Sequence, residues 1–339
     1  MKIKQILSVV WLILLLAFFI PYSPKINLPT DQSSWIQQIQ TDWIQLDKNN
    51  LLAGTILISQ NNQVIYSQGD LDQKYAIGSI SKSFIGYYFY KHPHLKSDRV
   101  CNYIQQFCQL GLNQVTVNDL LLHRSNLAKT SELKIMLSYS FGLENHLDKI
   151  EEFTIKPEFI ETSKIRFRYS NLGYLYLSRI IELSEKKYFE TIMNEIFQDL
   201  SLNNTSVATT SNAPKVVLLI PWTPIRIQTS FINQAARSFG AGGIISTASD
   251  LQKWFQILNE TEMKNNAEQN PDHYAAGLIS TQNHLGNILW HNGAVLGFRS
   301  LSLITENKLQ IILLTNHLKP FEFLESCLEP FESFYKKRK

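Results

Sequence analysis

The chain has 339 residues, of which 44% are hydrophobic and 18% are charged, a composition that excludes a disordered tail or a fibrous repeat. Its net charge is +3, but six of the 32 basic residues lie at Lys2, Lys4 and positions 336–339, which leaves 26 against 29 acidic residues. The slightly acidic body argues against a nucleic-acid-binding face, so we expect no nucleic-acid partner. The length fits one large α/β domain or two smaller domains.

The N-terminal segment predicts a membrane anchor or an export signal. Residues 6–20 are apolar except for Ser8 and follow Lys2 and Lys4. At ~1.5 Å per residue this run measures about 22 Å, less than a hydrocarbon core of about 30 Å. It ends in large residues, which favours an uncleaved anchor over a cleaved signal. We therefore interpret residues 1–29 as an anchor or signal followed by a stalk, with the body on the extracytoplasmic face, or secreted if the signal is cleaved.

The cysteine content limits what can stabilise the fold. Cys101, Cys108 and Cys327 are too few for a disulfide scaffold and have no metal-ligand spacing with any histidine. The sequence therefore predicts no metal site. Cys101 and Cys108 either form one disulfide bond outside the cytoplasm or stay as buried thiols, and the sequence leaves both open.

In chain order, the hydrophobic pattern predicts a helix, a hairpin and a helical block. The first helix spans 34–47, and two β-rich runs, 55–59 and 64–67, flank an asparagine-containing turn. Helical patterns then cover 83–90, 117–123, 172–184 and 188–200. Beyond residue 240 the pattern predicts a helix over 248–258, strands over 287–295, 301–305 and 309–315, and a last helix over 321–335.

The distribution of these elements indicates how the chain is organised. Strands lie near both ends, so we expect one sheet built from N- and C-terminal parts, with the helical block inserted between them. We assign a single domain over 30–339, with a sheet lobe at 30–78 and 241–339 and a helical lobe at 79–240.

One motif carries nucleophile chemistry. Ser79 and Lys82 form an S-x-x-K sequence after Gly78. At a separation of three residues on a helix, serine and lysine share one face, so the amine reaches the hydroxyl. A serine in a first helical turn also lies near unpaired N–H groups that favour developing negative charge. Alone, the motif more often marks a capping serine beside a solvated lysine than a catalytic pair.

Two further motifs follow at wide spacing. Tyr169 and Asn171 form Y-x-N directly before a predicted helix, and His291 and Gly293 form H-x-G, followed by Ala294, on a predicted strand. Neither motif is specific alone, because a histidine on a strand is more often structural than catalytic. Their order behind S-x-x-K makes the set specific.

Together these motifs resemble the β-lactamase-related serine hydrolases, which include class C β-lactamases, D-alanyl-D-alanine carboxypeptidases, D-aminopeptidases and esterases. Segments 115–127, 165–174 and 241–250 are also similar to family segments, and the resemblance covers residues 47–316. It implies an α/β, β-lactamase/transpeptidase-like fold, with an antiparallel sheet flanked by helices and an inserted helical block.

The resemblance also implies catalytic roles. Ser79 is the expected nucleophile that forms an acyl-enzyme, and Lys82 and Tyr169 share the proton transfer, without a decision on which of them takes the serine proton. Asn171 is expected to hold Lys82 and a substrate amide. His123, in the segment 115–127, is expected to be structural.

The remaining site residues concern the substrate. The backbone N–H groups of Ser79 and Ala294 are expected to form an oxyanion hole, and Gly293 to border the substrate. His291 stands where β-lactamases have lysine and is expected to orient Tyr169 or to meet a substrate carboxylate. With an ordinary pKa of about 6.5, this imidazole would be neutral at pH 7.5 and would gain charge toward pH 6.

The sequence predicts a serine hydrolase without a cofactor, acting on an amide or ester substrate such as a cell-wall-type D-amino-acid peptide. The alternatives are a β-lactamase, or a penicillin-binding or sensor protein that keeps the fold without turnover. An interaction protein that uses the N-terminal anchor and the basic residues 336–339 would leave the motif set unexplained. The expected partners are a small-molecule or peptide substrate and, through the N-terminal segment, a membrane.

Overall fold

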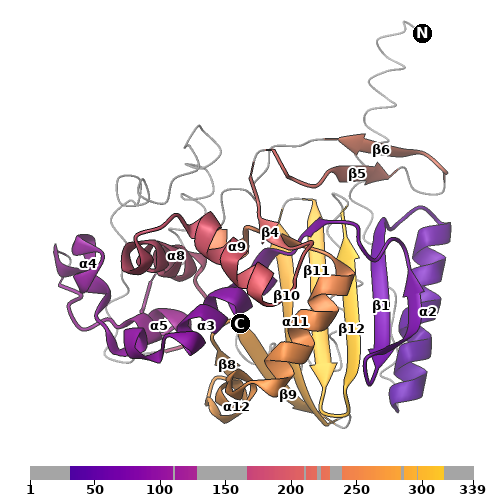
Figure 1. Ribbon diagram of the computed structural model, residues 1–339. Coiled ribbons are helices and arrows are strands. Elements are labelled where there is room, and N and C mark those ends of the chain that lie inside the picture. The colour runs from indigo at the N-terminus through magenta and orange to yellow at the C-terminus, as the bar shows by residue number, and fades with distance from the viewer. Residues whose placement is uncertain are drawn as a thin grey trace, which may run out of the picture.

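The computed structural model describes residues 31–109, 111–127, 166–209, 211–219, 223–229, 239–283, 286–295 and 297–316. Within these residues, seven strands form one antiparallel sheet in the order β2-β1-β12-β11-β10-β9-β8 (Figure 1). The strands are β1 (Gly54–Gln60), β2 (Gln63–Gln68), β8 (Tyr274–Ala275), β9 (Leu278–Asn283), β10 (Gly286–Val295), β11 (Phe298–Thr305) and β12 (Leu309–Thr315). Strand β1 pairs with β12, which confirms the predicted sheet from both chain ends.

The hairpin turns follow from residues that tolerate a positive φ. Asn61 and Asn62 connect β1 to β2 with φ values of 49° and 70°, the two-residue geometry that matches the twist of paired strands. The turn after β11, predicted at residues 306 and 307, extends to Lys308, whose φ is 60°. Both predicted hairpins are therefore confirmed.

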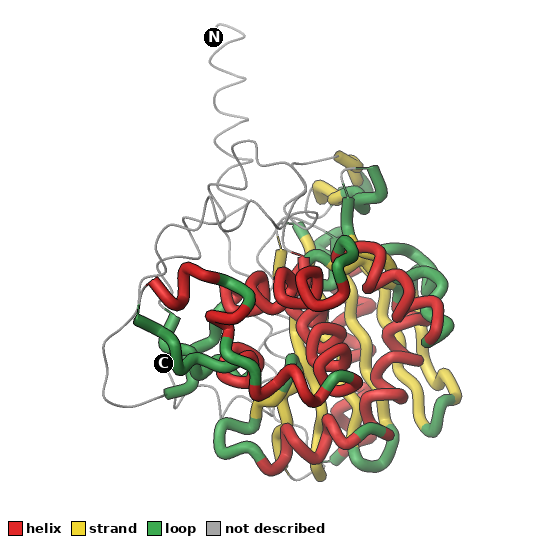
Figure 2. The backbone as a smooth tube through the Cα atoms, turned by 60° about the vertical axis from the view of Figure 1, so that its left-hand side comes forward, coloured by secondary structure: helices red, strands yellow, loops and turns green. Residues whose placement is uncertain are grey.

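The sheet is covered on both faces, which explains why β1 is apolar without alternation. On one face, helix α2 (Gln32–Lys48) buries Trp35 and Trp43 against Ile56 and Ile58. The opposite face contributes Leu57 to the larger core, which it shares with α11 (Ala248–Glu260) and the helical block. Figure 2 shows most of the helices gathered on that face.

Within the described residues, the helical block contains the four predicted helices, with bounds close to the predicted ones, and four further short helices that were not predicted. It contains η1 (Gly78–Ile80), α3 (Ser81–Lys91), η2 (Pro93–Ser97), η3 (Val100–Asn102), α4 (Gln105–Gln109), α5 (Val117–Leu121), α8 (Asn171–Glu185) and α9 (Phe189–Asp199). Helix α5 ends before the predicted residue 123 because His123 adopts a left-handed backbone with φ 55°. Asn126 is also left-handed, with φ 58°, a backbone conformation that asparagine tolerates better than most residues.

Several elements were not predicted. Strands β3 (Tyr75–Ala76), β7 (Ile244–Ser246) and β4 (Ser206–Val207) form a small sheet, and β5 (Val216–Leu219) pairs with β6 (Arg226–Thr229). Helices α10 (Phe239–Gly242) and α12 (Glu262–Gln269) complete the described elements. Strands of two to four residues are too short for a sequence period. The division into two lobes stays a prediction.

The structure settles one alternative and leaves the termini as predictions. Cys101 and Cys108 form a disulfide bond, with their Cα atoms 5.1 Å apart. The N-terminal residues 1–29 and the C-terminal helix predicted over 321–335 lie outside the described residues. Among the described helices, none combines the length and apolar character that crossing a membrane requires.

Candidate active site

Ser79 lies in the turn η1, against strand β10. Gly78 takes a φ of 52°, a region that favours glycine. A Cβ atom on Gly78 would lie 2.5 Å from the amide nitrogen of Ala294, and one on Gly293 would overlap the carbonyl oxygen of Ile77. The two glycines therefore let the turn and the strand touch along their backbones, which places the partly exposed Ser79 beside Ala294.

Lys82 lies on the first turn of α3 and is completely buried. Its Nζ is 3.0 Å from Ser79 Oγ, 2.7 Å from Asn171 Oδ1 and 2.5 Å from the carbonyl oxygen of Ala241. The amide and carbonyl oxygens accept only, so two N–H groups point at them. The remaining side of Nζ faces Ser79. A Lys82 ammonium donates a hydrogen bond to Ser79 Oγ there, whereas a neutral amine accepts one from the Ser79 hydroxyl.

Tyr169 and Asn171 come from the segment that begins α8. The Ser170 side chain caps this helix by accepting from the Gly173 N–H at 3.2 Å, which places Asn171 in the first helical turn. The ring of Tyr169 covers Lys82, with Nζ 4.9 Å from the ring centroid. The Y-x-N motif therefore contacts Lys82 from two sides.

His123 holds the segment that carries Tyr169 in place. Its carbonyl oxygen accepts from the Arg168 N–H at 2.7 Å, and its Nδ1 accepts from the Ser170 N–H at 3.1 Å. Its ring also packs against that of Tyr169, with the centroids 4.4 Å apart. His123 therefore holds the backbone on both sides of Tyr169, as expected of a structural residue.

The ring of His123 continues into a chain of hydroxyl groups. Because Nδ1 accepts, Nε2 carries the proton and donates to Tyr274 Oη at 3.0 Å. Tyr274 donates to Tyr174 Oη at 3.3 Å, and Tyr174 donates to the Leu121 carbonyl at 3.0 Å. Burial and the nearby Lys82 and His291 hold the pKa of His123 well below its usual value, so the ring is neutral.

His291 lies on β10 and is 1% exposed. Its Nδ1 is 2.5 Å from the Asn292 carbonyl oxygen, which only accepts, so Nδ1 carries the proton. Nε2 is then an acceptor, and it has no hydrogen-bond partner among the described residues. The rings of His291 and Tyr169 lie 6.4 Å apart.

The expected protonation of His291 near pH 6 is wrong. Burial, followed by the electrostatic effect of Lys82, lowers its pKa to about 3, while the hydrogen bond to Asn292 opposes this shift. The ring is therefore neutral at every pH between 5 and 8. The expectation of a neutral imidazole at pH 7.5 agrees with this value.

The structure thus brings the residues of all three motifs together. Ser79, Lys82 and Asn171 are in direct contact, Tyr169 covers Lys82, and Gly293 and Ala294 lie beside the Ser79 turn. Sequence reasoning missed the Ala241 carbonyl and Tyr274, because a backbone acceptor and a single tyrosine leave no signal in a motif. In the described part of the chain, no three histidine, cysteine or acidic residues are grouped to hold a metal ion.

Comparison with known proteins agrees with this geometry. The chain matches the family model Beta-lactamase over residues 36–328 and belongs to that family, whose members are serine hydrolases. The fold is thus β-lactamase/transpeptidase-like, as expected.

Solved structures with the same fold carry different activities. The octameric penicillin-binding protein homologue from Pyrococcus abyssi has a TM-score of 0.68 at 18% identity, over 89% of this chain and 80% of that one. A D-stereospecific amidohydrolase from Streptomyces sp. has a TM-score of 0.67 at 18% identity, over 89% and 99%. EstCE1, a hydrolase with promiscuous acyltransferase activity, has a TM-score of 0.68 at 16% identity, over 86% and 95%. No curated protein sequence matches the chain.

Proposed function

We propose that the protein is a serine acyl hydrolase that cleaves amide or ester substrates through an acyl-enzyme on Ser79. The observation that carries this proposal is the contact of the buried Lys82 Nζ with Ser79 Oγ, while Asn171 and the Ala241 carbonyl fix the amine from the other side. A lysine held in this way is positioned to act on one hydroxyl group.

The roles follow from this arrangement. The Lys82–Tyr169 pair takes up the proton of Ser79 as Oγ forms a bond to the substrate carbonyl carbon. The backbone N–H groups of Ser79 and Ala294 stabilise the negative oxygen of the tetrahedral intermediate. The leaving alcohol or amine departs with a proton passed on from Lys82 by the Tyr169 hydroxyl, and water then hydrolyses the acyl-enzyme.

The neutral His291 favours substrates without a carboxylate. At the position of the β-lactamase lysine, this chain brings no charge toward a substrate carboxylate, because the imidazole stays neutral above about pH 3. The proposed substrates are therefore amides of D-amino acids and uncharged esters. The structural similarity to a D-stereospecific amidohydrolase and to EstCE1 supports both classes.

Covalent labelling and a small substrate panel test the proposal. A fluorophosphonate probe should label Ser79 of the full-length protein, and Ser79→Ala should abolish both the label and turnover, whereas Ser81→Ala should keep both. We expect D-phenylalanine amide and p-nitrophenyl butyrate to be hydrolysed at least tenfold faster in kcat/KM than D-Ala-D-Ala and a chromogenic cephalosporin.

The alternatives give different outcomes. A cephalosporin that is the preferred substrate at pH 8 would identify a β-lactamase and overturn the substrate preference. A label on Ser79 without turnover of any substrate would identify a penicillin-binding or sensor protein.

We also propose that residues 1–29 anchor the body on the extracytoplasmic face of a membrane. The disulfide bond between Cys101 and Cys108 supports this, because such bonds persist in oxidising compartments. After carbonate extraction the protein should stay in the membrane pellet with an intact N-terminus. A soluble form that begins near residue 23 would instead show a cleaved signal.

A further inference from the structure

A cavity lies beyond the active-site residues along α3. It has a volume of about 230 Å³, is partly open to solvent, and is bordered by α3, η2, α5, α12 and the β8–β9 turn. None of Ser79, Lys82, Tyr169, Asn171 or His291 lines it. The space is large enough for several water molecules, so it fits a small organic molecule.

Close backbone contact separates the cavity from the active site. A Cβ atom on Gly86 would overlap the carbonyl oxygen of Ala276, and one on Gly277 would overlap the backbone of Lys82. The β8–β9 turn is therefore packed directly on α3 between the two sites. The cavity is a separate compartment and not an extension of the catalytic one.

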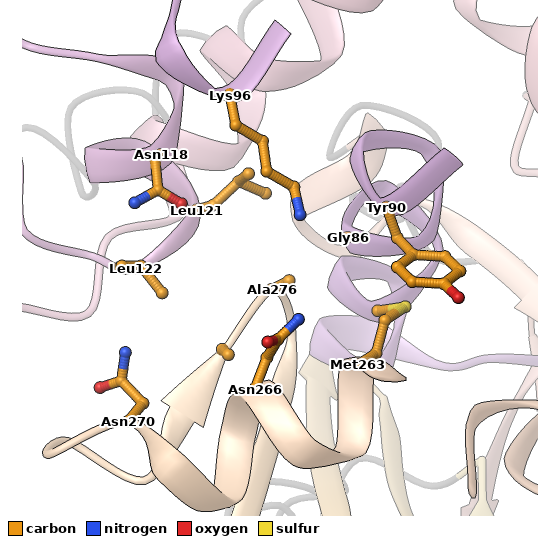
Figure 3. Close-up of a pocket in the computed structure, with 11 residues that line it drawn as sticks. Gly86, Tyr90, Lys96, Asn118, Leu121, Leu122, Met263, Asn266, Asn270 and Ala276 are labelled. Carbon is orange, nitrogen blue, oxygen red and sulfur yellow. The ribbon is translucent and has the colours of Figure 1, made fainter. Parts of the chain in front are cut away.

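The cavity is lined by one cation and by uncharged groups. Figure 3 shows the Lys96 side chain extending from η2 into the space, with the Asn266 amide facing it from α12. Asn118 and Asn270 add further carboxamides, and Leu121, Leu122 and Met263 form apolar walls. Among the described residues, no aspartate or glutamate lines the cavity.

Lys96 has no charge partner in the described part of the chain. It is half-buried, and burial alone lowers its pKa, with no contribution from a carboxylate or a hydrogen bond. In contrast, Lys264 on the same helix as Asn266 pairs with Glu268 at 4.0 Å, and Arg124 pairs with Asp272 at 2.6 Å. Partly burying an ammonium without a counter-charge is unfavourable, unless an anion enters with it.

We propose that this cavity binds a small monocarboxylate with a short apolar chain. The Lys96 ammonium pairs with the carboxylate, and the Asn118 and Asn266 amides donate hydrogen bonds to its oxygens. Leu121, Leu122 and Met263 cover the apolar chain, whose burial adds to the affinity. The cation and the apolar wall together select a fatty-acid-like or acyl-amino-acid-like molecule over a free inorganic anion.

A matched pair of ligands separates charge recognition from apolar filling. Hexanoate and hexanamide have the same shape, and only hexanoate carries a charge. Titration of the full-length protein by calorimetry at pH 7 should show hexanoate binding at least tenfold more tightly than hexanamide. Inorganic phosphate should bind more weakly than hexanoate, because it lacks the apolar chain.

Matched variants locate the binding. Lys96→Met keeps the apolar stem and should weaken hexanoate at least tenfold without changing hexanamide, whereas Lys96→Arg should retain hexanoate. Lys264→Met, outside the cavity, should bind as the wild type does. Equal binding of hexanoate and hexanamide, unchanged binding in Lys96→Met, or no binding at all overturns the proposal. Ester hydrolysis by Lys96→Met reports on the catalytic site separately and shows that the variant is folded.

Discussion

Two buried histidines beside Lys82 are neutral in opposite tautomers. His123 accepts the Ser170 N–H at Nδ1 and donates from Nε2, whereas His291 donates from Nδ1 to the Asn292 carbonyl and keeps Nε2 as an acceptor. Burial lowers the pKa of both rings, so neither carries a charge. In each histidine, the neighbouring backbone group therefore determines which ring nitrogen donates and which accepts.

The two rings differ in how many of their nitrogen atoms have a hydrogen-bond partner. Both nitrogen atoms of His123 are bonded, and its ring and carbonyl hold the segment that presents Tyr169. The Nε2 atom of His291 is buried without a partner among the described residues. Such an atom costs free energy of folding, and it is typical of sites where function outweighs stability. We therefore expect His123 to govern stability and His291 to govern substrate preference.

The largest expected effect concerns His123. His123→Ala removes a buried ring, leaves the Ser170 N–H without its acceptor and removes the donor to the Tyr274 hydroxyl, which should lower the free energy of unfolding by about 3–5 kcal/mol. Urea denaturation followed by circular dichroism measures this loss. The exposed His94→Ala serves as the control and should change stability by less than about 0.5 kcal/mol. A loss below about 1 kcal/mol in His123→Ala would contradict the structural role.

The second prediction concerns pH. His291 has a pKa of about 3 in the folded protein, so the unfolded chain, with its ordinary pKa near 6.5, binds a proton first as the pH falls. Stability from this group is complete above about pH 6.5 and decreases as the pH falls toward 3. Between pH 7.5 and 5 the loss should be about 2 kcal/mol.

The neighbouring His123 adds a loss of the same sign, because burial also lowers its pKa. Denaturation midpoints measured at several pH values between 5 and 7.5 test both groups, since carboxylates contribute mainly below this window. His291→Gln should remove the His291 part and keep the rest. A midpoint independent of pH in the wild type would show that these rings are not held neutral.

A third prediction concerns substrate preference. His291→Lys should raise kcat/KM for a cephalosporin relative to p-nitrophenyl butyrate by about tenfold, because an ammonium offers a charge-assisted contact to the carboxylate. His94→Lys makes the same change of residue at an exposed position and should leave the ratio unchanged. An unchanged ratio in a folded His291→Lys would separate this residue from carboxylate recognition.

Much of the fold could be predicted because its core elements leave clear apolar patterns. The helix with Trp35 and Trp43 has a helical period, and the strands that become β1 and β12 are short apolar runs bounded by turn residues. The short strands β3, β4 and β7 were missed, because pairings of two or three residues form only when the surrounding chain brings them together. The left-handed backbone of His123 likewise shortened α5 without a signal in the sequence.

The site was predictable to a different degree. The contact between Ser79 and Lys82 follows from local spacing, whereas Lys82 and Asn171, 89 residues apart, could be joined only through family resemblance. The pKa of His291 could not be predicted, because it depends on burial and on Lys82, which the fold brings close. The tautomers of both histidines likewise depend on a backbone donor and a backbone acceptor that only the structure locates.

The smallest expected effect tests how far the role of His123 extends. Tyr274→Phe removes one hydroxyl, so the Nε2–H of His123 loses its acceptor, but the ring of His123 still accepts from Ser170. Tyr174 keeps its bond to the Leu121 carbonyl. The free energy of unfolding should therefore fall by only about 1 kcal/mol, and kcat should not change.

Urea denaturation and ester hydrolysis of Tyr274→Phe measure the free energy of unfolding and kcat. The control is Tyr66→Phe, which removes the hydrogen bond from Tyr66 to Gln68 on β2. A loss as large as that of His123→Ala would assign the stabilisation to the hydroxyl chain rather than to the bond with Ser170. A lower kcat at unchanged stability would show instead that the hydroxyl chain affects catalysis. It would do so through His123, which positions Tyr169.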